Sequence, residues 1–290
     1  MPIVDEVERE LFRLRARESD GSLTGQRTST MTHVVWAPPR WLERAREVLA
    51  GLEERHPART IFLIPERGRS NQVKADVRLR QTTVEGLAGE VFAEVIELRL
   101  RGGASEHPAS LLLPLLVSDL PAFCRWRGEP GWRSSALAEI VGVCDRLVVN
   151  SSEWPRASRG YARLCSLFDR IAVSDIAYSR TLPWRARIAE LWPSVAEVER
   201  LRVEGPQADA LLLAGWLRSR LRRDVSLSRR HAPEVQAVWL DGEPLEVVTG
   251  APRSPSDLLS DELDVTGRDK VYEAAVRAAA DASELDDAWL

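Results

Sequence analysis

The order of hydrophobic and polar residues predicts short helices and strands along most of the chain. Residues 5–17 carry an apolar side chain at every third or fourth position, which is the spacing of one helical face. Residues 31–36 and 60–64 are apolar runs, typical of strands that are covered on both faces. Between them, the segment that begins at Pro38 and Pro39 repeats apolar residues at helical spacing, so a strand–helix–strand unit is predicted.

Strict alternation in residues 73–80 predicts a different kind of strand. Apolar and polar side chains alternate there with a period of two, which indicates one buried and one solvated face, as in an antiparallel sheet. Residues 91–101 follow after a turn and are the predicted partner strand. Further along, Asp241 and Gly242 separate two alternating segments, and this dipeptide is the strongest short hairpin signal in the chain.

From residue 108 onward, predicted helices alternate with short apolar strands. The helices cover residues 108–116, 135–143, 155–168, 186–191, 208–221 and 269–280, and the strands cover residues 122–126, 146–150, 171–173 and 198–203. This alternation predicts an α/β fold of two α/β units, with mixed parallel and antiparallel sheets flanked by helices. The expected division is an N-terminal helix and linker at 1–26, α/β domains at 27–150 and 151–252, and an acidic helical tail at 253–290.

Charge and hydropathy exclude several classes of protein. The net charge is −4, and residues 253–290 hold ten acidic and four basic side chains, so the preceding residues carry only +2. A nucleic-acid-binding protein usually has a clear basic excess, so no nucleic-acid partner is expected. The longest apolar run has seven residues, whereas a membrane span needs about 20. The acidic N-terminus is unlike a secretory signal, and an odd number of cysteines, three, favours the reducing cytoplasm.

Familiar catalytic motifs are absent from the sequence. It contains no G-x-G, no Gly-Lys dipeptide and no G-x-S-x-G, so the fingerprints of dinucleotide-binding proteins, P-loop proteins and α/β-hydrolases are missing. None of the four histidines lies at metal-ligand spacing from another histidine or from a cysteine. We therefore predict no catalytic residue, no cofactor and no metal ion, and a protein that is not an enzyme.

Two groups of side chains are candidates for binding. Arg78 and Arg80 share one face of the alternating strand, and Arg99 and Arg101 are expected on its neighbour, so the four could form an anion-binding stripe. The alternative is an ordinary solvated sheet face. The second group is formed by tryptophans beside turns or prolines, where a ring is more often partly exposed: Trp126, Trp132, Trp154 and Trp184. The alternative for each of them is packing in the core, whereas the group as a whole favours a protein-binding surface.

Six segments in the same order resemble one known family. They are RTSTMTHVVWAP (27–38), ERHPARTIFLIP (54–65), LLLPLLVSDLPAF (111–123), DRLVVNSSEW (145–154), DIAYSRTLPWRARIAELW (175–192) and ADALLLAGWLRSRL (208–221). The chain resembles the OpcA family of glucose-6-phosphate dehydrogenase assembly or subunit proteins. The abundance of arginine and the short C-terminal region are similar to the actinobacterial type.

This resemblance implies a function without catalysis. OpcA-type proteins promote the oligomeric assembly or the allosteric activation of glucose-6-phosphate dehydrogenase, which opens the oxidative pentose phosphate pathway. The chain is accordingly expected to be a cytoplasmic partner of that enzyme. The family has no settled active site, so no catalytic residue is carried over. Cyanobacterial relatives are linked to redox control through late cysteines, whereas the last cysteine here is Cys165.

The expected contact segment lies at residues 180–187. Pro183 is expected to limit helix formation there, which would present Trp184 and Arg185 at a loop–helix junction, flanked by Arg180 and Arg187. Alternatively, Trp184 packs over the next helix and the arginines are solvated. The alternative function is an α/β domain that binds a sugar phosphate or nucleotide, or an uncharacterised enzyme, and the strand–helix alternation and the arginine stripe motivate it.

Overall fold

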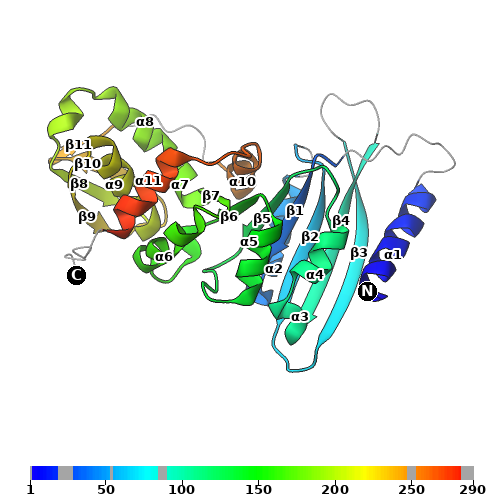
Figure 1. The fold of residues 1–290 in the computed structure, drawn as a ribbon. Coiled ribbons are helices and arrows are strands. Elements are labelled where there is room, and N and C mark those ends of the chain that lie inside the picture. Colours follow the sequence, from blue (N-terminus) through cyan, green and yellow to red (C-terminus); the bar gives the residue numbers. More distant parts are fainter. Residues whose placement is uncertain (1, 19–28, 53–54, 84–89, 247–252, 282–290) are drawn as a thin grey trace. The chain divides into compact units, whose positions relative to one another are not determined.

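The computed structural model describes residues 2–18, 29–52, 55–83, 90–246 and 253–281, with the backbone alone for residues 81–83 and 90–92. Its contacts divide the chain into two compact units. The α-helices and β-strands of both units are labelled in Figure 1. Unit 1 consists of Met1–Val148 and Ser254–Thr266, and unit 2 consists of Val149–Arg253 and Gly267–Leu290. The acidic C-terminal region thus contributes one segment to each unit.

A largely parallel sheet forms the core of unit 1. Its strands are β1 (Met31–Trp36), β2 (Ala58–Glu66), β3 (Gln72–Thr83), β4 (Glu90–Arg101), β5 (Ala122–Trp126) and β6 (Arg146–Val149). Hydrogen-bonded neighbours follow the order β3-β4-β2-β1-β5-β6. These pairs are parallel except for β3 and β4, which are antiparallel along their whole length. The predicted mixed sheet and the predicted pairing of residues 73–80 with residues 91–101 are confirmed.

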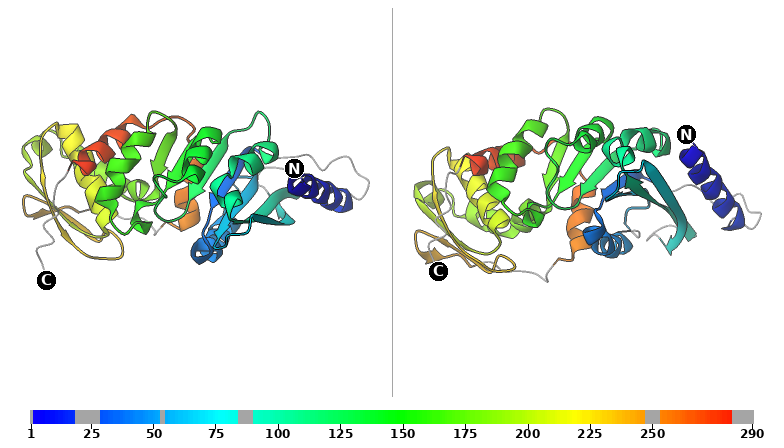
Figure 2. Two further views of the ribbon diagram at one scale, coloured as in Figure 1. Left: turned by 60° about the horizontal axis from the view of Figure 1, so that its bottom comes forward. Right: turned by 90° about the horizontal axis from the view of Figure 1, so that it is seen from below.

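Helices lie on both faces of this sheet (Figure 2). One face carries α2 (Pro39–Ala50) and α10 (Pro255–Leu263), and the other carries α4 (Ala109–Leu112), the 3-10 turn η1 (Leu113–Leu115) and α5 (Ser135–Val143). The short helix α3 (Gly103–Glu106) follows β4, and α1 (Pro2–Glu18) packs against β3. Leu42, Ala45 and Leu49 of α2 share one buried cluster with Phe62 and Ile64 of β2, which explains the apolar pattern of these segments.

Unit 2 combines a small mixed sheet with a bundle of helices. Its elements are η2 (Ser151–Glu153), α6 (Ala157–Leu164), η3 (Cys165–Leu167), β7 (Ala172–Asp175), α7 (Ile176–Arg180), α8 (Leu182–Glu190), η4 (Ser194–Glu197), β8 (Arg200–Glu204), α9 (Gln207–Leu221), β9 (Ser226–Arg230), β10 (Ala237–Leu240), β11 (Glu243–Pro244) and α11 (Lys270–Ala280). The small sheet has the order β11-β10-β8-β9. Its predicted hairpin is confirmed, because Asp241 and Gly242 both take positive φ angles, 51° and 96°, as the tight turn requires.

The helix α9 is the buried centre of unit 2. It packs along α11, which lies beside it in Figure 1. At the crossing, a Cβ atom added to Gly215 would lie 2.9 Å from Ala279 Cβ and would clash with the Ala275 carbonyl oxygen. A side chain at this position would therefore force the two helices apart.

The structure also differs from the sequence-based expectations. The helix predicted at residues 108–116 is two short turns, α4 and η1, because Pro114 has no N–H with which to continue an α-helix. The elements α7, β9 and α10 were not predicted. Helix α8 begins at Leu182, four residues before the segment where a helix was expected.

Candidate functional site

The predicted contact segment, residues 180–187, folds into the end of α7 and most of α8. The loop–helix junction expected at Pro183 does not form, because Pro183 occupies the second position of α8. The first turn of a helix needs no N–H donor at that position, so a proline is accommodated there. Trp184 follows in the same turn and is buried, with 6% of its surface exposed.

The expectation that tryptophans beside turns are partly exposed is wrong for three of the four residues. Trp126, Trp154 and Trp184 are 3%, 6% and 6% exposed. Only Trp132 of this group is half-buried. Among the tryptophans that the structure describes, the exposed indole is that of Trp192, just after α8, at 67%. Proximity to a proline or a turn could not separate these cases, because such a residue can face either the core or the solvent.

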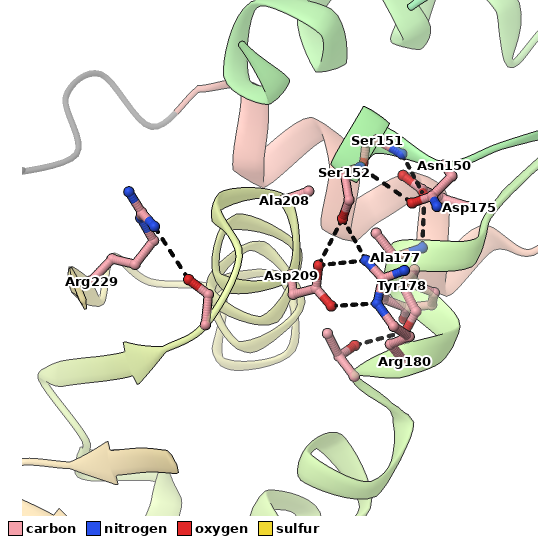
Figure 3. Close-up of polar contacts among 12 residues, drawn as sticks. Asn150, Ser151, Ser152, Asp175, Ala177, Tyr178, Arg180, Ala208, Asp209 and Arg229 are labelled. Atoms are coloured by element: carbon pink, nitrogen blue, oxygen red, sulfur yellow. Dashed lines mark hydrogen bonds and ion pairs between the residues drawn. The ribbon is translucent and has the colours of Figure 1, made fainter. Parts of the chain in front are cut away.

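Arg180, the last residue of α7, binds a carboxylate in the first turn of α9 (Figure 3). Its Nε and Nη2 atoms donate to the two carboxylate oxygens of Asp209 at 2.9 and 2.8 Å. The Ser152 hydroxyl donates to Asp209 Oδ2 at 3.0 Å and accepts a hydrogen bond from Arg180. Because Asp209 is only 1% exposed, this bidentate pair neutralises a buried carboxylate. Arg180 thus fastens α7 to α9, and its guanidinium is engaged inside unit 2.

Asp175 ends β7 and caps α7, as Figure 3 shows. Its Oδ1 atom accepts hydrogen bonds from the backbone N–H of Ala177 at 2.9 Å and of Ser151 at 3.0 Å. Burial raises the pKa of Asp175 to about 6, and this effect outweighs the hydrogen bonds from Ser151 and Ala177 and the nearby charge of Arg180. Asp175 is therefore a buried carboxyl group that titrates in mildly acidic solution.

The groups around Asp175 are arranged to hold the backbone rather than to react. The Ser151 hydroxyl lies 2.8 Å from that of Tyr161, which reaches the Ala208 carbonyl at 3.3 Å. Burial raises the pKa of Tyr161 well above its ordinary value, so this phenol is a poor general base. Ser151 and Tyr161 are fully buried, at 0% exposure, which leaves a substrate no access to them.

The two remaining arginines of the predicted segment differ in accessibility. The guanidinium of Arg185 lies over the ring of Tyr178, 3.6 Å from its centre, and its Nε donates to Thr181 Oγ1 at 3.0 Å. The side chain of Arg187 is 41% exposed and pairs with Glu190, which is itself 64% exposed, at 2.9 Å. A surface pair of this kind contributes little to stability, so Arg187 is the charge of this segment that can be redirected to a partner.

The outward side of α8 carries apolar groups as well as charge. Leu182 and Trp192 are 51% and 67% exposed. Pro183, Ala186 and Ala189 are also exposed on this helix, opposite its buried residues. Together with Arg187 and Glu190, these residues form what we call the α8 face. Sequence reasoning expected Trp184 on the exposed side of this segment, whereas Trp184 and Ile188 form its buried side, because they lie at the same helical spacing as the exposed residues. Contact of this segment with a partner stays a prediction.

The predicted arginine stripe lies on β3 and β4, and carboxylates accompany it. Arg78 Nη2 binds Glu97 at 2.6 Å, while Arg99 and Arg101 both bind Glu66, at 2.9 and 2.8 Å. The register places Arg80 opposite Ala93, far along the ladder from Arg101, which lies opposite Gln72. The arginines therefore stand at two separate places on the ladder, and anion binding by them stays a prediction.

Cysteines and metal-ligating groups offer no other reactive cluster in the described ranges. Cys124 and Cys144 are buried, and Cys165 is half-buried. Burial raises the pKa values of Cys124 and Cys165, so these thiols stay protonated at neutral pH. Within the described ranges, no three His, Cys, Asp or Glu side chains gather as metal ligands would. No helix in the same ranges is both long and apolar enough to cross a bilayer.

Comparison with known protein families accounts for most of the chain. Residues 50–166 match the model of the glucose-6-phosphate dehydrogenase subunit N-terminal domain, and residues 171–276 match that of the C-terminal domain. No curated protein matches the chain at a significant level. The two matches stand in the order of their names and together cover well over half of the 290 residues. The chain therefore belongs to the OpcA family of glucose-6-phosphate dehydrogenase subunit proteins.

Proposed function

We propose that this protein is a non-catalytic partner of glucose-6-phosphate dehydrogenase that promotes the assembly of its oligomer, its allosteric activation, or both. The observation that carries the proposal is the pair of family matches, which name an assembly domain and a subunit domain and run in order through both units. The polar network around Asp175 and Arg180 is consistent with this role, because its groups are used for internal contacts. We expect the protein to work in the cytoplasm and to bind no nucleic acid.

The α8 face is the surface that we propose for contact with the dehydrogenase. It offers an exposed tryptophan, an exposed leucine and an arginine that is held by a surface ion pair and by an exposed hydrogen bond to the Glu246 carbonyl. Trp and Arg are enriched among the residues that dominate binding energy. Arg180, Trp184 and Arg185 support the face from beneath, since they fix α7 and α8 in place. Arg187 is the member of the predicted segment that we expect to touch the partner directly.

The mechanism requires that the protein binds one state of the dehydrogenase better than another. A partner with equal affinity for both states would change neither assembly nor activity. Typical coupling free energies of about 1–3 kcal/mol would alter the dehydrogenase equilibrium by about 5–150-fold.

The experiment combines the purified chain with its cognate dehydrogenase. The mass of the mixture is measured by size-exclusion chromatography with light scattering, and dehydrogenase activity is followed against the concentration of added chain. We expect a defined complex and a saturable change in activity or in oligomer size. The absence of a complex together with unchanged kinetics would contradict the proposed function.

Variants then test the surface separately from the function. Trp192→Ala and Arg187→Glu are expected to weaken the complex, by about 30-fold for a dominant contact residue. Arg159→Glu is the matched control, because Arg159 is an exposed arginine on α6 of the same unit. If both α8 variants bind like the control while the complex still forms, the contact lies elsewhere and the proposed function stands without this surface.

A further inference from the structure

We infer that an open pocket in unit 1 binds a small phosphorylated sugar, either free or as the sugar phosphate of a nucleotide. The pocket has a volume of about 420 Å³, which is in the range of small-molecule sites. It lies at the carboxyl ends of β1, β2 and β5, where Trp36, Pro65 and Trp126 contribute to its wall. The inference depends on unit 1 alone and goes beyond the proposed role as a partner.

The strand order singles out this position in the sheet. β1 has β2 on one side and β5 on the other. The strands that follow β1 in the sequence, β2 to β4, are added on one side of it, and the later strands β5 and β6 are added on the other side. In open α/β sheets, ligands bind outside the carboxyl ends of the strands at the point where the strand order reverses. The pocket is lined by the residues that end β1 and β5 and by those that follow them, including Pro38 and Arg127. Its place is therefore the one that this topology favours for a ligand.

An aromatic wall gives the pocket a flat apolar surface. The rings of Trp36 and Trp126 are stacked, with centres 4.7 Å apart and planes inclined by 15°. Their register is fixed because the two residues are directly paired across β1 and β5. The part of these rings that reaches the pocket is an apolar contact for the CH groups of a sugar ring. The two rings cover one another and are only 7% and 3% exposed, so a small and fixed part of them faces the pocket.

The start of two helices makes one end of the pocket attractive to an anion. Pro38 and Arg40 belong to the start of α2, and Ser134 and Ser135 to the start of α5. Neither helix has an acidic side chain in its first turn, so the partial positive charge of both N-termini is not offset there. Arg40 and Arg127 add two guanidinium groups to the lining.

Two carboxylates lie near these cations and disfavour an anion that carries no hydrogen-bond donor. Glu106 and Glu129 also line the pocket. A bare anion would meet repulsion from them, whereas the hydroxyl groups of a sugar can donate hydrogen bonds to a carboxylate while its phosphate faces the arginines. The chemistry of the lining thus fits a ligand that carries a phosphate and several hydroxyl groups on a ring.

The loop after β5 packs closely against the start of α2 beside the pocket. Gly128 has a φ angle of 77°, which favours glycine, and it turns the chain directly after Arg127. A Cβ atom at Gly128 would lie 2.9 Å from Trp41 Nε1 and 3.5 Å from Arg40 Nη2. The guanidinium of Arg127 lies over the ring of Trp41, 4.9 Å from its centre. Gly128 thus lets the loop pack closely against Trp41 and Arg40 at the edge of the pocket.

Binding is tested by isothermal titration calorimetry of the full chain in the absence of the dehydrogenase. The probes are glucose 6-phosphate and AMP, with glucose and inorganic phosphate as partial ligands. We expect saturable binding of at least one phosphorylated sugar, with quenching of tryptophan fluorescence, and at least about tenfold weaker binding of each partial ligand, since each loses one set of contacts. Binding of glucose 6-phosphate alone assigns a free sugar phosphate, and binding of AMP alone assigns a nucleotide.

Two variants place the ligand in the pocket. Arg40→Glu reverses a charge at the pocket and is expected to weaken binding by at least about tenfold. Arg44→Glu, one turn further along α2, is its control, because Arg44 is exposed but does not line the pocket. Ser135→Trp fills the space from the start of α5 and should also abolish binding.

The inference fails if neither phosphorylated sugar binds the folded chain with saturation. It also fails if a ligand binds but both Arg40→Glu and Ser135→Trp bind it as well as Arg44→Glu does. Because no dehydrogenase is present in this titration, failure here leaves complex formation untouched, and the two proposals are distinguished.

Discussion

Two buried carboxylates, Glu94 in unit 1 and Asp175 in unit 2, are held in opposite ways. In unit 1, Glu94 on β4 is 4% exposed and receives hydrogen bonds from both Arg59 and Arg15. Burial raises its pKa, but the two arginines outweigh burial and hold the pKa below its ordinary value. In unit 2, Asp175 is bonded mainly by backbone N–H groups, and burial raises its pKa to about 6.

The difference teaches that burial alone does not decide whether the pKa of a buried carboxyl group is raised or lowered. A directly bonded guanidinium converts a buried carboxylate into a group that favours the charged state. Glu97, on the same strand as Glu94, repeats the arrangement, with Arg46 from α2 and Arg78 from β3 bound to it. Glu94 and Glu97 thus rely on ion pairs where Asp175 caps a helix, and Asp209 in the same unit as Asp175 follows the first arrangement through Arg180.

The largest effect is expected from removing one partner of a buried pair. Glu94→Gln leaves the guanidinium of Arg59, a residue only 1% exposed, without its buried charged partner, and the remaining ion pair is with Glu8, whose side chain is 42% exposed. Breaking a buried ion pair in this way lowers the free energy of unfolding by about 3–5 kcal/mol. Urea denaturation measures the loss.

Glu66→Gln is the matched control in the same sheet. Glu66 also binds two arginines, but their side chains are 42% exposed. Because solvent screens such pairs, the free energy of unfolding should fall by at most about 1 kcal/mol. Equal losses in the two variants would show that burial does not set the strength of these pairs.

The second test uses the pH dependence of unfolding. His33 in unit 1 is 3% exposed, and burial, together with the charges of Arg125 and His56, lowers its pKa to about 3. The unfolded chain binds the proton more readily, so the stability that neutral His33 provides is complete above about pH 6.5 and is lost as the pH falls toward 3. The expected loss is about 1.4 kcal/mol per pH unit within that window.

Asp175 has the opposite effect to His33, because its contribution to stability grows as the pH falls. Its pKa is higher in the folded chain, at about 6, than the ordinary value of 3.8, so the folded state binds the proton more readily. Its contribution to stability is complete below pH 3.8 and is lost as the pH rises through about 6. In Asp175→Asn the free energy of unfolding should therefore fall more steeply between pH 6.5 and 4.5 than in the unchanged chain, by about 2 kcal/mol over this interval. Identical slopes in urea titrations at the two pH values would contradict the assignment.

The third test compares two glycines inside helices. Gly215 of α9 lies against α11, and Gly142 of α5 has no atom within 4 Å of an added Cβ. Gly215→Ala should destabilise unit 2 by about 1–3 kcal/mol because the helices must separate. Gly142→Ala should stabilise unit 1 by about 0.5–1 kcal/mol because alanine restricts the unfolded backbone. Thermal unfolding of both variants measures the opposite signs, and a neutral Gly215→Ala would show that the crossing is loose.

Local patterns in the sequence predicted the elements well and their environment less well. β1 and β5 were predicted to the residue, because apolar runs between turn residues are strong local signals. The buried Arg59 within β2 carries no such signal, since its partner Glu94 lies 35 residues away. The division of the C-terminal region between the units was equally inaccessible, because it depends on which surface each amphipathic helix meets.

For the candidate sites, too, local sequence patterns did not predict which side chains are exposed or which distant residues meet. The segment at residues 180–187 was chosen for a tryptophan and arginines beside Pro183 and stays a prediction as a contact site, but which side of α8 is exposed depends on packing against the rest of unit 2. The pocket in unit 1 was not foreseen, because Trp36 and Trp126 are distant in sequence and meet only through the pairing of β1 with β5.

The smallest expected effects test where the two C-terminal helices belong. Ser254 caps α10 through a reciprocal capping box with Asp257, and Asp269 caps α11 by accepting from the N–H groups of Val271 and Tyr272. Loss of such a cap costs about 1 kcal/mol. Because α10 contacts α2 in unit 1 and α11 contacts α9 in unit 2, Ser254→Ala should increase hydrogen exchange in α2, and Asp269→Ala should increase it in α9. Hydrogen exchange followed by mass spectrometry resolves the two responses. An increase in α9 with Ser254→Ala, or in α2 with Asp269→Ala, would mean that the units do not behave as separate cooperative bodies.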